Sequence, residues 1–439
     1  MALSTQPYKG ARDFYPEDMR VRKYMFGVMR SVAERFGYEE YDAPILEPLE
    51  LYLAKTGEEI VTEQTYMFTD RGKRDVAIRP EMTPTVSRMV AGRRQELAYP
   101  LRWYSIPNLW RYERPQRGRL REHWQLNVDI FGIAGLQAEH EIIQLADSIM
   151  QKYGAERSMY TIKLGSRQLI NAALGEYLGL TEVQAHTISK LIDRMHKMDH
   201  GEFLAQADAV LSPSEREAGT NSKLFALLEA KTLSDLPEEL CRHEFVAQLK
   251  KLLELLRQGG ITNAIFDISL MRGLDYYTDI VFEVFDNHPE NNRAMFGGGR
   301  YDGLVGLFGV EPVPTVGFGM GDVTIQNFLQ THDLLPKIQP ETDLYVILIG
   351  EVIGEIYDRA QPIISELREM GLNIAVDSSG RKPDKQIKAA VKKGIHNALF
   401  IGENELAEEQ YMLKNLETGI EGKHSAARIV SLVKDYRNR

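Results

Sequence analysis

The sequence LRWYSIPNLWRYERPQRGRLREHWQLNVDIFG, which spans Leu101–Gly132, contains two strand-like runs on either side of a basic centre. In the second run apolar and polar residues alternate with a period of two, which predicts a half-buried strand. Its apolar face carries Trp124, Leu126, Val128 and Ile130, and its polar face carries His123, Gln125, Asn127 and Asp129. Amides and a carboxylate along one face suggest a cleft that selects a small ligand, in place of an ordinary solvent-facing surface.

The turn between the two runs is a basic hairpin loop, Arg114–Arg119, with a proline and a glycine as breakers. Five arginines and one glutamate, Glu113, occur between Arg111 and Arg121. Guanidinium groups bind phosphate through paired hydrogen bonds and do not lose their charge. The loop therefore suits a nucleotide, the end of a nucleic acid, or both, although a solvated charged hairpin fits the same residues equally well.

The whole chain has 439 residues, of which 43% are hydrophobic and 26% charged, as in a globular protein of two or three domains. No apolar run approaches membrane-spanning length and the first residues lack a signal-peptide pattern, so neither a membrane nor secretion is expected. The single cysteine, Cys241, excludes intrachain disulfides and multi-cysteine metal sites and fits a reducing cytoplasm. Because the net charge is -10, any contact with nucleic acid must come from local basic patches.

A hairpin is predicted over Tyr66–Ile78, and the segment Arg79-Pro-Glu-Met-Thr-Pro84 follows it. Thr83 is expected to cap a helix that begins at Pro84. Glu81 would then lie just before a helix start, where backbone N–H groups are free. A surface or helix-dipole carboxylate is the simpler interpretation of Glu81.

From about Arg167 to Gly260 the strand pattern disappears and helical runs replace it, which predicts a helical insertion. Three histidines occur close together within this part, His186, His196 and His200. Without further cysteines or a helical HExxH pair they are interpreted as surface residues, and no metal site built from protein ligands is expected.

Strand character returns after residue 262 and is interrupted by the cluster Arg272-Gly-Leu-Asp-Tyr-Tyr277. The run Gly297–Gly299 then allows a close approach of the backbone to another group. Taken alone, such a run is more typical of a bend than of a phosphate-binding loop.

Beyond a linker at Gln339–Thr342, strands and helices alternate, which predicts a mostly parallel α/β domain. This domain contains a basic run with one acid, Asp384, among its cations. The cations are Arg381, Lys382, Lys385, Lys388, Lys392 and Lys393. They form a candidate nucleic-acid patch, and a solvated helix face is the competing interpretation.

Several of these segments together resemble the histidyl-tRNA synthetase family of class II aminoacyl-tRNA synthetases along nearly the whole chain. The resemblance rests on KGARDFYP, RPEMTP, WRYERPQRGRLREHWQ, RGLDYY, GGGRYDGL and GFGMG, which occur in that order. It implies an α+β catalytic domain on an antiparallel class II sheet, with a helical insertion and a C-terminal α/β anticodon-binding domain. The expected ranges are 1–166 and 261–335 for the catalytic domain, 167–260 for the insertion, and 341–439 for the anticodon-binding domain. A homodimer with the PILEP region at the subunit interface is also implied.

In this family ATP activates L-histidine as histidyl-adenylate, and the histidine is then transferred to the 3′-terminal ribose of its tRNA. The resemblance implies that Arg111 and Arg272 are catalytic and contact the α-phosphate. The implied histidine-binding residues are Glu81, Thr83, Arg111, Gln125, Asp129, Arg272, Tyr276, Tyr277 and Tyr301. The implied ATP-binding residues are Arg111, Glu113, Arg119 and Arg272, with Mg²⁺ carried on the phosphates. The implied tRNA-binding residues are Gln116, Arg117, Arg381, Lys382, Lys385 and Lys388.

Two positions depart from the family pattern. Asp129 occurs where a glutamate is common, and Thr324 occurs where many members have an arginine that holds the γ-phosphate; Arg119 is a candidate replacement. The alternative function is that of a regulatory histidine-binding protein with a synthetase fold and no aminoacylation activity. The complete C-terminal domain argues against that alternative, because the regulatory subunits lack it.

Overall fold

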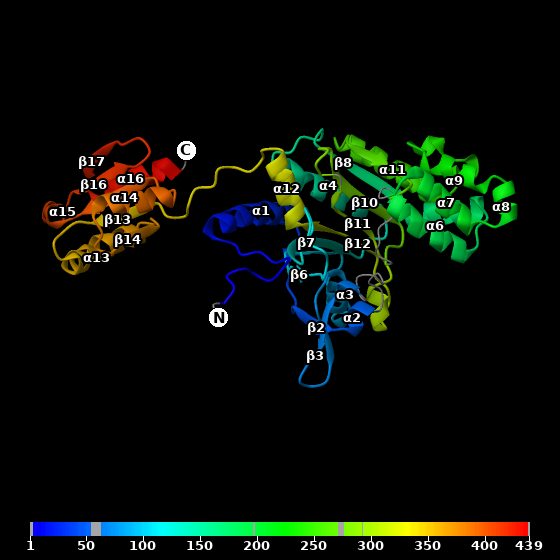
Figure 1. Ribbon diagram of the computed structural model, residues 1–439, viewed down its shortest axis with the longest axis horizontal. Coiled ribbons are helices and arrows are strands. Elements are labelled where there is room, and N and C mark those ends of the chain that lie inside the picture. The colour runs from blue at the N-terminus through cyan, green and yellow to red at the C-terminus, as the bar shows by residue number, and fades with distance from the viewer. Residues whose placement is uncertain (1–2, 54–62, 196–197, 271–275, 292, 438–439) are drawn as a thin grey trace. The chain divides into compact units, whose positions relative to one another are not determined.

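The computed structural model describes residues 3–53, 63–195, 198–270, 276–291 and 293–437 (Figure 1). The chain divides into two compact units, each with its own sheet. The first unit comprises Met1–Phe14 and Arg22–Leu335, and the second comprises Tyr15–Val21 and Pro336–Arg439. None of the described helices is both long and apolar enough to cross a bilayer.

The first unit is built on a sheet with the strand order β1-β5-β7-β12-β11-β10-β8-β9, in which β6 also pairs with β7. All neighbours from β5 to β8 in this order are antiparallel, whereas the edge pairs β1·β5 and β8·β9 are parallel. The strands are β1 (Glu39–Glu40), β5 (Leu101–Ser105), β6 (Asn108–Trp110), β7 (Glu122–Phe131), β8 (Tyr160–Ser166), β9 (Ala264–Phe266), β10 (Ile280–Asp286), β11 (Ala294–Arg300) and β12 (Thr315–Gly321). The predicted antiparallel catalytic sheet is thereby confirmed.

Strand β7 lies in the interior of this sheet and has two different buried faces. Leu126, Val128 and Ile130 are fully buried, and β7 contacts helices α4 (Gln137–Lys152) and α12 (Asp322–Thr331). Asn127 and Asp129 on the other face are also buried. The polar face is therefore no solvent surface, as its amides and carboxylate suggested.

A small antiparallel sheet has the order β2-β4-β3 and contains the predicted hairpin. Helix α3 begins at Thr83, with Met82 at the N-cap position and no side-chain capping bond, so the prediction that Thr83 caps this helix is wrong. Backbone N–H groups at the first two helical positions make no intrahelical hydrogen bond, so a proline, which has no N–H, is tolerated at either position. The sequence therefore does not decide whether the helix begins at Thr83 or at Pro84. The elements are α1 (Pro16–Arg35), β2 (Leu46–Pro48), α2 (Glu50–Leu53), β3 (Tyr66–Thr69), β4 (Asp75–Ile78) and α3 (Thr83–Gly92).

In the described part of residues 167–260 every regular element is helical, as predicted. The α-helices are α5 (Arg167–Ala172), α6 (Glu182–Arg194), α7 (His200–Val210), α8 (Pro213–Glu217), α9 (Thr220–Leu228), α10 (Glu238–Cys241) and α11 (Glu244–Gln258). His186 and His200 are exposed, which confirms that they are surface residues. His196 lies outside the described residues.

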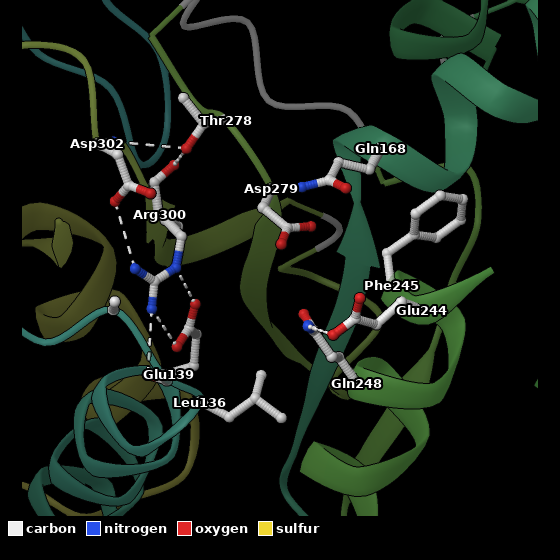
Figure 2. Close-up of a pocket in the computed structure, with 12 residues that line it drawn as sticks. Leu136, Glu139, Gln168, Glu244, Phe245, Gln248, Thr278, Asp279, Arg300 and Asp302 are labelled. Carbon is white, nitrogen blue, oxygen red and sulfur yellow. Dashed lines mark hydrogen bonds and ion pairs between the residues drawn. The ribbon is translucent and has the colours of Figure 1, made fainter.

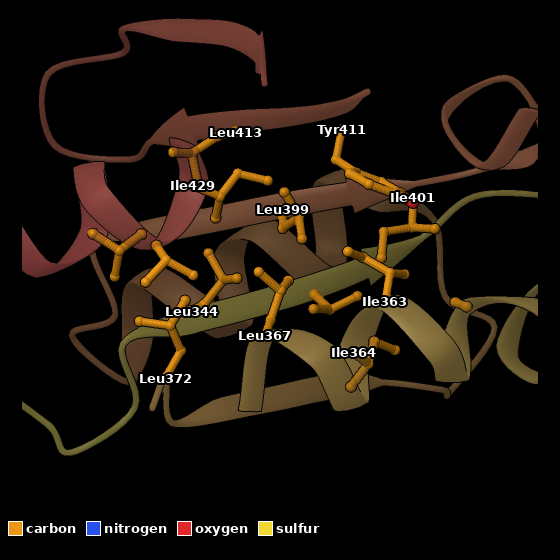
Figure 3. Packing of buried hydrophobic residues seen from close by; sticks show 14 of the residues in the cluster. Leu344, Ile363, Ile364, Leu367, Leu372, Leu399, Ile401, Tyr411, Leu413 and Ile429 are labelled. Atoms are coloured by element: carbon orange, nitrogen blue, oxygen red, sulfur yellow. The ribbon is translucent and has the colours of Figure 1, made fainter. Parts of the chain in front are cut away.

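The second unit has the strand order β14-β13-β15-β16-β17. Its first three strands are parallel, but β16 and β17 are antiparallel and were not predicted, because the apolar run of β16 is only three residues long and β17 is short and polar. Figure 3 shows the apolar core, in which strand residues such as Leu344 and Leu399 pack against Ile364 and Leu367 of α13 and Ile429 of α16. The elements are β13 (Leu344–Leu348), α13 (Ile353–Glu369), β14 (Ile374–Asp377), α14 (Pro383–Lys392), β15 (Asn397–Ile401), α15 (Glu403–Glu408), β16 (Tyr411–Asn415), β17 (Glu421–His424) and α16 (Ala426–Arg437).

Candidate active site

The polar face of β7 adjoins a strip of the sheet that carries no side chains. Asp129 is in register with Gly317 of β12, which is in register with Gly299 of β11. A Cβ atom on Gly317 would lie 2.1 Å from Asp129 Oδ1, and one on Gly319 would lie 2.8 Å from Gln125 Cδ. The Gly317 position requires glycine, because a Cβ there would also lie 2.7 Å from the backbone carbonyl oxygen of Val128. A Cβ on Gly319 would meet only the flexible end of the Gln125 side chain, so the polar side chains of β7 lie directly over this glycine strip.

The run Gly297–Gly299 forms part of β11, so its interpretation as a bend is wrong. A Cβ atom on Gly298 would lie 1.9 Å from the carbonyl oxygen of Gly317. The close backbone approach that this run permits is therefore made to the adjacent strand β12. A run of glycines in the sequence cannot distinguish a bend from a closely packed strand, because both require residues without a Cβ atom.

Three buried tyrosines, Tyr276, Tyr277 and Tyr301, cluster near this glycine strip. The ring centroid of Tyr276 lies 4.9 Å from that of Tyr277 and 5.5 Å from that of Tyr301. The Tyr301 hydroxyl donates a hydrogen bond to Asp129 Oδ1, and the Tyr276 hydroxyl donates one to Glu81 Oε2 over 3.1 Å. The tyrosines thus join two carboxylates from distant segments into one cluster.

The second oxygen of Asp129, Oδ2, is buried and has no hydrogen-bond partner among the described residues. Burial raises the pKa of Asp129 to about 7, although the hydrogen bond from Tyr301 favours the charged form. Buried acceptors in native proteins nearly always have a partner, and an exception calls for an explanation. A ligand with a ring N–H or an ammonium group would supply the missing donor.

Arg111 and Glu81 lie beside each other through the intervening backbone. The Arg111 Nε donates to the carbonyl oxygen of Pro80 over 2.9 Å. Glu81 is buried, whereas Thr83 in the first turn of α3 is partly buried. Sequence reasoning placed these groups in one site by family resemblance, and the fold brings them together through the β6–β7 pairing and the segment before α3. Arg272, the second predicted catalytic arginine, lies outside the described residues.

The other end of the polar face of β7 is cationic. Burial and the charges of Arg111, Arg12 and Arg119 lower the pKa of His123 to about 3, so its imidazole is neutral. Glu113, a buried carboxylate, forms an ion pair with Arg119 Nε at 2.9 Å. Six residues of strand separate His123 from Asp129, or ~20 Å. The face therefore has a carboxylate end and a phosphate-compatible end.

Arg12 was not predicted as a site residue, because nothing in the sequence pairs it with a position some 300 residues away. Its Nη2 contacts Asp322 Oδ2 at 2.6 Å, and Asp322 also accepts a bond from the Trp124 N–H. Thr324 lies in the first turn of α12, and its hydroxyl donates to Met295 O over 2.7 Å. Thr324 is thus a structural residue, and the cations of this end come from other segments.

The basic loop is tied to neighbouring segments. Arg117 pairs with Glu290, with 3.2 Å between Nη1 and Oε2, and Gln116 Oε1 accepts a bond from Arg293 over 3.2 Å. Both Arg117 and Gln116 remain accessible. The loop does not lie among the tyrosines, so its predicted residues form a separate group from the Asp129 cluster.

Figure 2 shows a cavity of about 330 Å³ that is separate from this site. Arg300, on the cavity wall, pairs with Val316 of β12, and Val316 pairs with Ile130 of β7. Paired residues point to the same face of a sheet, so Arg300 lies on the apolar face and not on that of Asp129. The Arg300 guanidinium pairs with Glu139, with 2.6 Å between Nε and Oε1. None of the predicted site residues that the structure describes lines this cavity.

In the second unit, the predicted cations extend from just before α14, at Arg381 and Lys382, to its C-terminal end at Lys392 and Lys393. Arg381 Nη2 contacts Asp377 Oδ2 at 2.7 Å. Lys382, Lys385 and Lys388 are exposed, and no described carboxylate forms an ion pair with them. The basic run therefore contains one fixed arginine and a set of solvated lysines.

An antiparallel sheet of this order, joined to a domain that matches an anticodon-binding family, is the architecture of a class II aminoacyl-tRNA synthetase. Residues 343–436 match the family model described as anticodon binding domain, and residues 10–322 match that of histidyl-tRNA synthetase. The chain belongs to the histidyl-tRNA synthetase family.

Known relatives agree with this assignment. The chain is 45% identical over 415 residues to a histidine–tRNA ligase of Leptospira biflexa, covering 94% of each chain. It is 37% identical over 420 residues to a histidine–tRNA ligase of Thermoplasma volcanium, covering 95% of each. The crystal structure of histidyl-tRNA synthetase from Nostoc sp. PCC 7120 superposes with a TM-score of 0.81 at 21% identity, covering 99% of this chain and all of that one, which shows a shared fold.

Proposed function

We propose that the protein ligates L-histidine to its cognate tRNA in two steps, with histidyl-adenylate as the intermediate and ATP as the activating substrate. The observation that carries this proposal is the buried Asp129 beside the glycine strip and the Tyr301 hydroxyl, because no described residue donates a hydrogen bond to its Oδ2. An imidazole ring would lie beside the glycine strip and the tyrosine rings, and its N–H would supply the donor. The match of residues 343–436 to an anticodon-binding domain favours a ligase over a purely regulatory histidine-binding protein.

Histidine would lie along the carboxylate end of the face. Asp129, Tyr277 and Tyr301 are assigned to the imidazole, and Glu81 with Thr83 to the α-amino group. The hydrogen bond from Tyr276 to Glu81 supports this division, because it fixes the Glu81 carboxylate inside the same cluster. Gln125, adjacent to Gly319, would border the substrate between the two ends.

ATP would lie toward the cationic end and enter as its magnesium complex, so that the metal belongs to the substrate. Arg111 is placed at the α-phosphate, where negative charge develops in the transition state, and Arg272 is assigned the same role. Glu113 and Arg119 are assigned to the nucleotide, since their ion pair adjoins the neutral His123. Arg119 would take the γ-phosphate role that Thr324 cannot fill.

The tRNA would meet two separate surfaces. Gln116 and Arg117 of the loop are assigned to the acceptor end, and the basic residues at the start of α14 to the anticodon arm. These latter residues are Arg381, Lys382, Lys385 and Lys388. The corresponding domain boundaries are 1–166 and 261–335 for catalysis, 167–260 for the insertion, and 341–439 for anticodon binding.

A homodimer is proposed from an exposed apolar surface around the small sheet. Its residues are Ile45, Leu46, Leu53, Met67 and Phe68. Large exposed apolar side chains gathered on one small sheet are typical of a protein interface. A cytoplasmic location is proposed as well, because the chain's single cysteine is a free, exposed thiol.

Histidine-dependent exchange of pyrophosphate into ATP tests the proposal. We expect exchange by the wild-type protein and a loss of roughly 100- to 1000-fold in Arg111→Gln, as when a transition-state donor is removed. Arg216→Gln is the control, because Arg216 is an exposed arginine of α8 outside the site. Histidine binding without exchange in the wild type would support the regulatory alternative.

A further inference from the structure

The Arg381 side chain is held in place by two groups at the end of β14. Its Nη2 contacts Asp377 at 2.7 Å, and its Nε donates to Ser379 Oγ over 2.8 Å. Asp377 is itself fixed, because it also accepts bonds from the Tyr345 hydroxyl over 2.9 Å and from Ser379. The carboxylate side chain of Asp377 is 3% exposed, whereas the Arg381 side chain is 50% exposed. A rigid anchor thus presents an accessible guanidinium.

The backbone of Arg381 is fixed as well. Gln386 is fully buried in α14, and its Nε2 donates to the carbonyl oxygen of Arg381 over 2.6 Å. A free arginine side chain loses up to ~2 kcal/mol of rotamer entropy when it is ordered. The Arg381 side chain loses this rotamer entropy when the protein folds, so a directional contact to a ligand causes a smaller further loss of entropy.

The neighbouring lysines differ in every one of these respects. Lys382, Lys385 and Lys388 are exposed and recur at a spacing of three, which places them on one side of the start of α14. Among the described residues, none forms an ion pair with a carboxylate. A flexible ammonium group acts on phosphate as a point charge, without the geometric requirement of a fork-shaped donor.

Two of the five N–H groups of Arg381 are used by Asp377 and Ser379, which leaves three for a ligand. The remaining edge is a fork of adjacent donors, and such a fork matches the paired acceptors O6 and N7 of guanine. A phosphate would satisfy the fork too, but the exposed lysines beside it can bind phosphate without an anchored side chain.

We infer that Arg381 recognises a base of the anticodon by its acceptor edge, with a purine that presents two acceptors as the preferred class. Asp377, Ser379 and Gln386 are positioning residues that act through Arg381. Lys382, Lys385 and Lys388 bind the phosphate backbone and supply affinity without selectivity. This division rests on the proposed binding of tRNA by the second unit.

The test compares charging of the cognate tRNA with charging of transcripts that carry single anticodon substitutions, across a series of salt concentrations. In Arg381→Gln we expect kcat/KM for the cognate tRNA to fall roughly 10- to 100-fold, as for one lost bidentate base contact. For the transcript substituted at the recognised base, Arg381→Gln is expected to cause no additional loss of kcat/KM. The variant therefore no longer distinguishes this transcript from the cognate tRNA. The dependence on salt is expected to stay unchanged.

The double variant Lys385→Gln/Lys388→Gln is expected to behave in the opposite way. Charging of all transcripts falls by the same factor, and the slope of log K against log salt decreases by about 0.7 for each lysine lost. Asp377→Asn is expected to reproduce the loss of discrimination, and Arg381→Gln/Asp377→Asn to be no worse than Arg381→Gln alone. Arg368→Gln, an exposed arginine of α13, is the control.

The inference is overturned if Arg381→Gln weakens charging of every transcript equally and lowers the salt slope, since that is the behaviour of a phosphate contact. It is overturned too if Arg381→Gln has no effect while the lysine variant does. If none of these variants alters charging, the proposed tRNA surface of the second unit is wrong. Histidine-dependent pyrophosphate exchange, measured in parallel, tests the first step independently of both.

Discussion

Two buried aspartates, one in each unit, have opposite electrostatic surroundings. Among the described residues Asp129 has one hydrogen-bond donor, the Tyr301 hydroxyl, and burial raises its pKa to about 7. Asp377 is also buried, but bonds from Ser379, Tyr345 and Arg381 outweigh the desolvation and lower its pKa to about 2. A carboxylate with too few hydrogen-bond donors can accept a bond from a ligand. A carboxylate whose oxygens all have donors is suited to fix another side chain in place.

The same contrast extends to the surroundings of the two carboxylates. Asp129 faces glycines that leave space, and Asp377 faces side chains that fill it. The first arrangement costs stability in the ligand-free protein, and binding of a donor recovers that cost. The second contributes to stability without any ligand.

The largest effect is expected from closing the space beside Asp129. In Gly317→Ala the new Cβ would meet Asp129 Oδ1 at 2.1 Å and the Val128 carbonyl oxygen at 2.7 Å. We expect histidine-dependent exchange to fall by more than ~100-fold, because strand β12 must move from its partner. Gly354→Ala in α13 is the matched control, since its Cβ would meet nothing within 4 Å and is expected to stabilise by up to about 1 kcal/mol. Normal use of histidine by Gly317→Ala would contradict the assignment of this glycine strip.

Removing the charge of Asp129 is expected to have the next largest effect. In Asp129→Asn the KM for histidine in the exchange reaction is expected to rise roughly 100-fold, as for the loss of a charge-assisted hydrogen bond. The KM for ATP is expected to change little, because the nucleotide lies toward the other end of β7. Equal changes in both constants would instead assign Asp129 a structural role.

Removing the charge of Asp377 is expected to affect the tRNA step alone. Asp377→Asn frees Arg381, and we expect kcat/KM for tRNA charging to fall roughly tenfold, by analogy with one weakened base contact. Pyrophosphate exchange is expected to remain at the wild-type rate. A parallel loss of exchange would indicate that Asp377 supports the whole fold and not a tRNA surface.

The smallest effect concerns the pH dependence of stability, in which the two variants are expected to differ in sign. A carboxyl group whose pKa is higher in the folded than in the unfolded protein lowers stability as the pH rises from the unfolded pKa, near 4, to the folded pKa, about 7. Asp129→Asn removes this loss, so it should increase Tm at about pH 8 and progressively less toward pH 5. A lowered folded pKa contributes stability above about pH 4, so Asp377→Asn should decrease Tm equally at both pH values. Calorimetry of the ligand-free protein, with shifts of roughly 2–6 °C expected, measures both. Shifts of the same sign at about pH 8 would show that the two carboxylates do not differ as described.

Sequence periodicity was sufficient wherever a signal was local. The alternation along β7, the helical part after Arg167 and the first β/α repeats of the second unit each follow from side chains a few residues apart. Family resemblance then grouped Glu81, Arg111 and Asp129, which no local pattern connects. The short antiparallel strands β16 and β17 were missed because an apolar run of three residues and a polar strand of four carry little periodic signal.

By itself the sequence determined the polar and apolar faces of the strands, the helical insertion, and the residue types available for chemistry, because these depend on spacing along the chain. Only the tertiary structure decided that Gly317 leaves room for the Asp129 carboxylate, that Arg12 reaches Asp322 in α12, and that Asp377 holds Arg381. The physical reason is that charge, hydration and steric space belong to neighbours in space. An aspartate can therefore remain available to a ligand, as Asp129 does, or fix another side chain, as Asp377 does, according to which donors the fold brings to it.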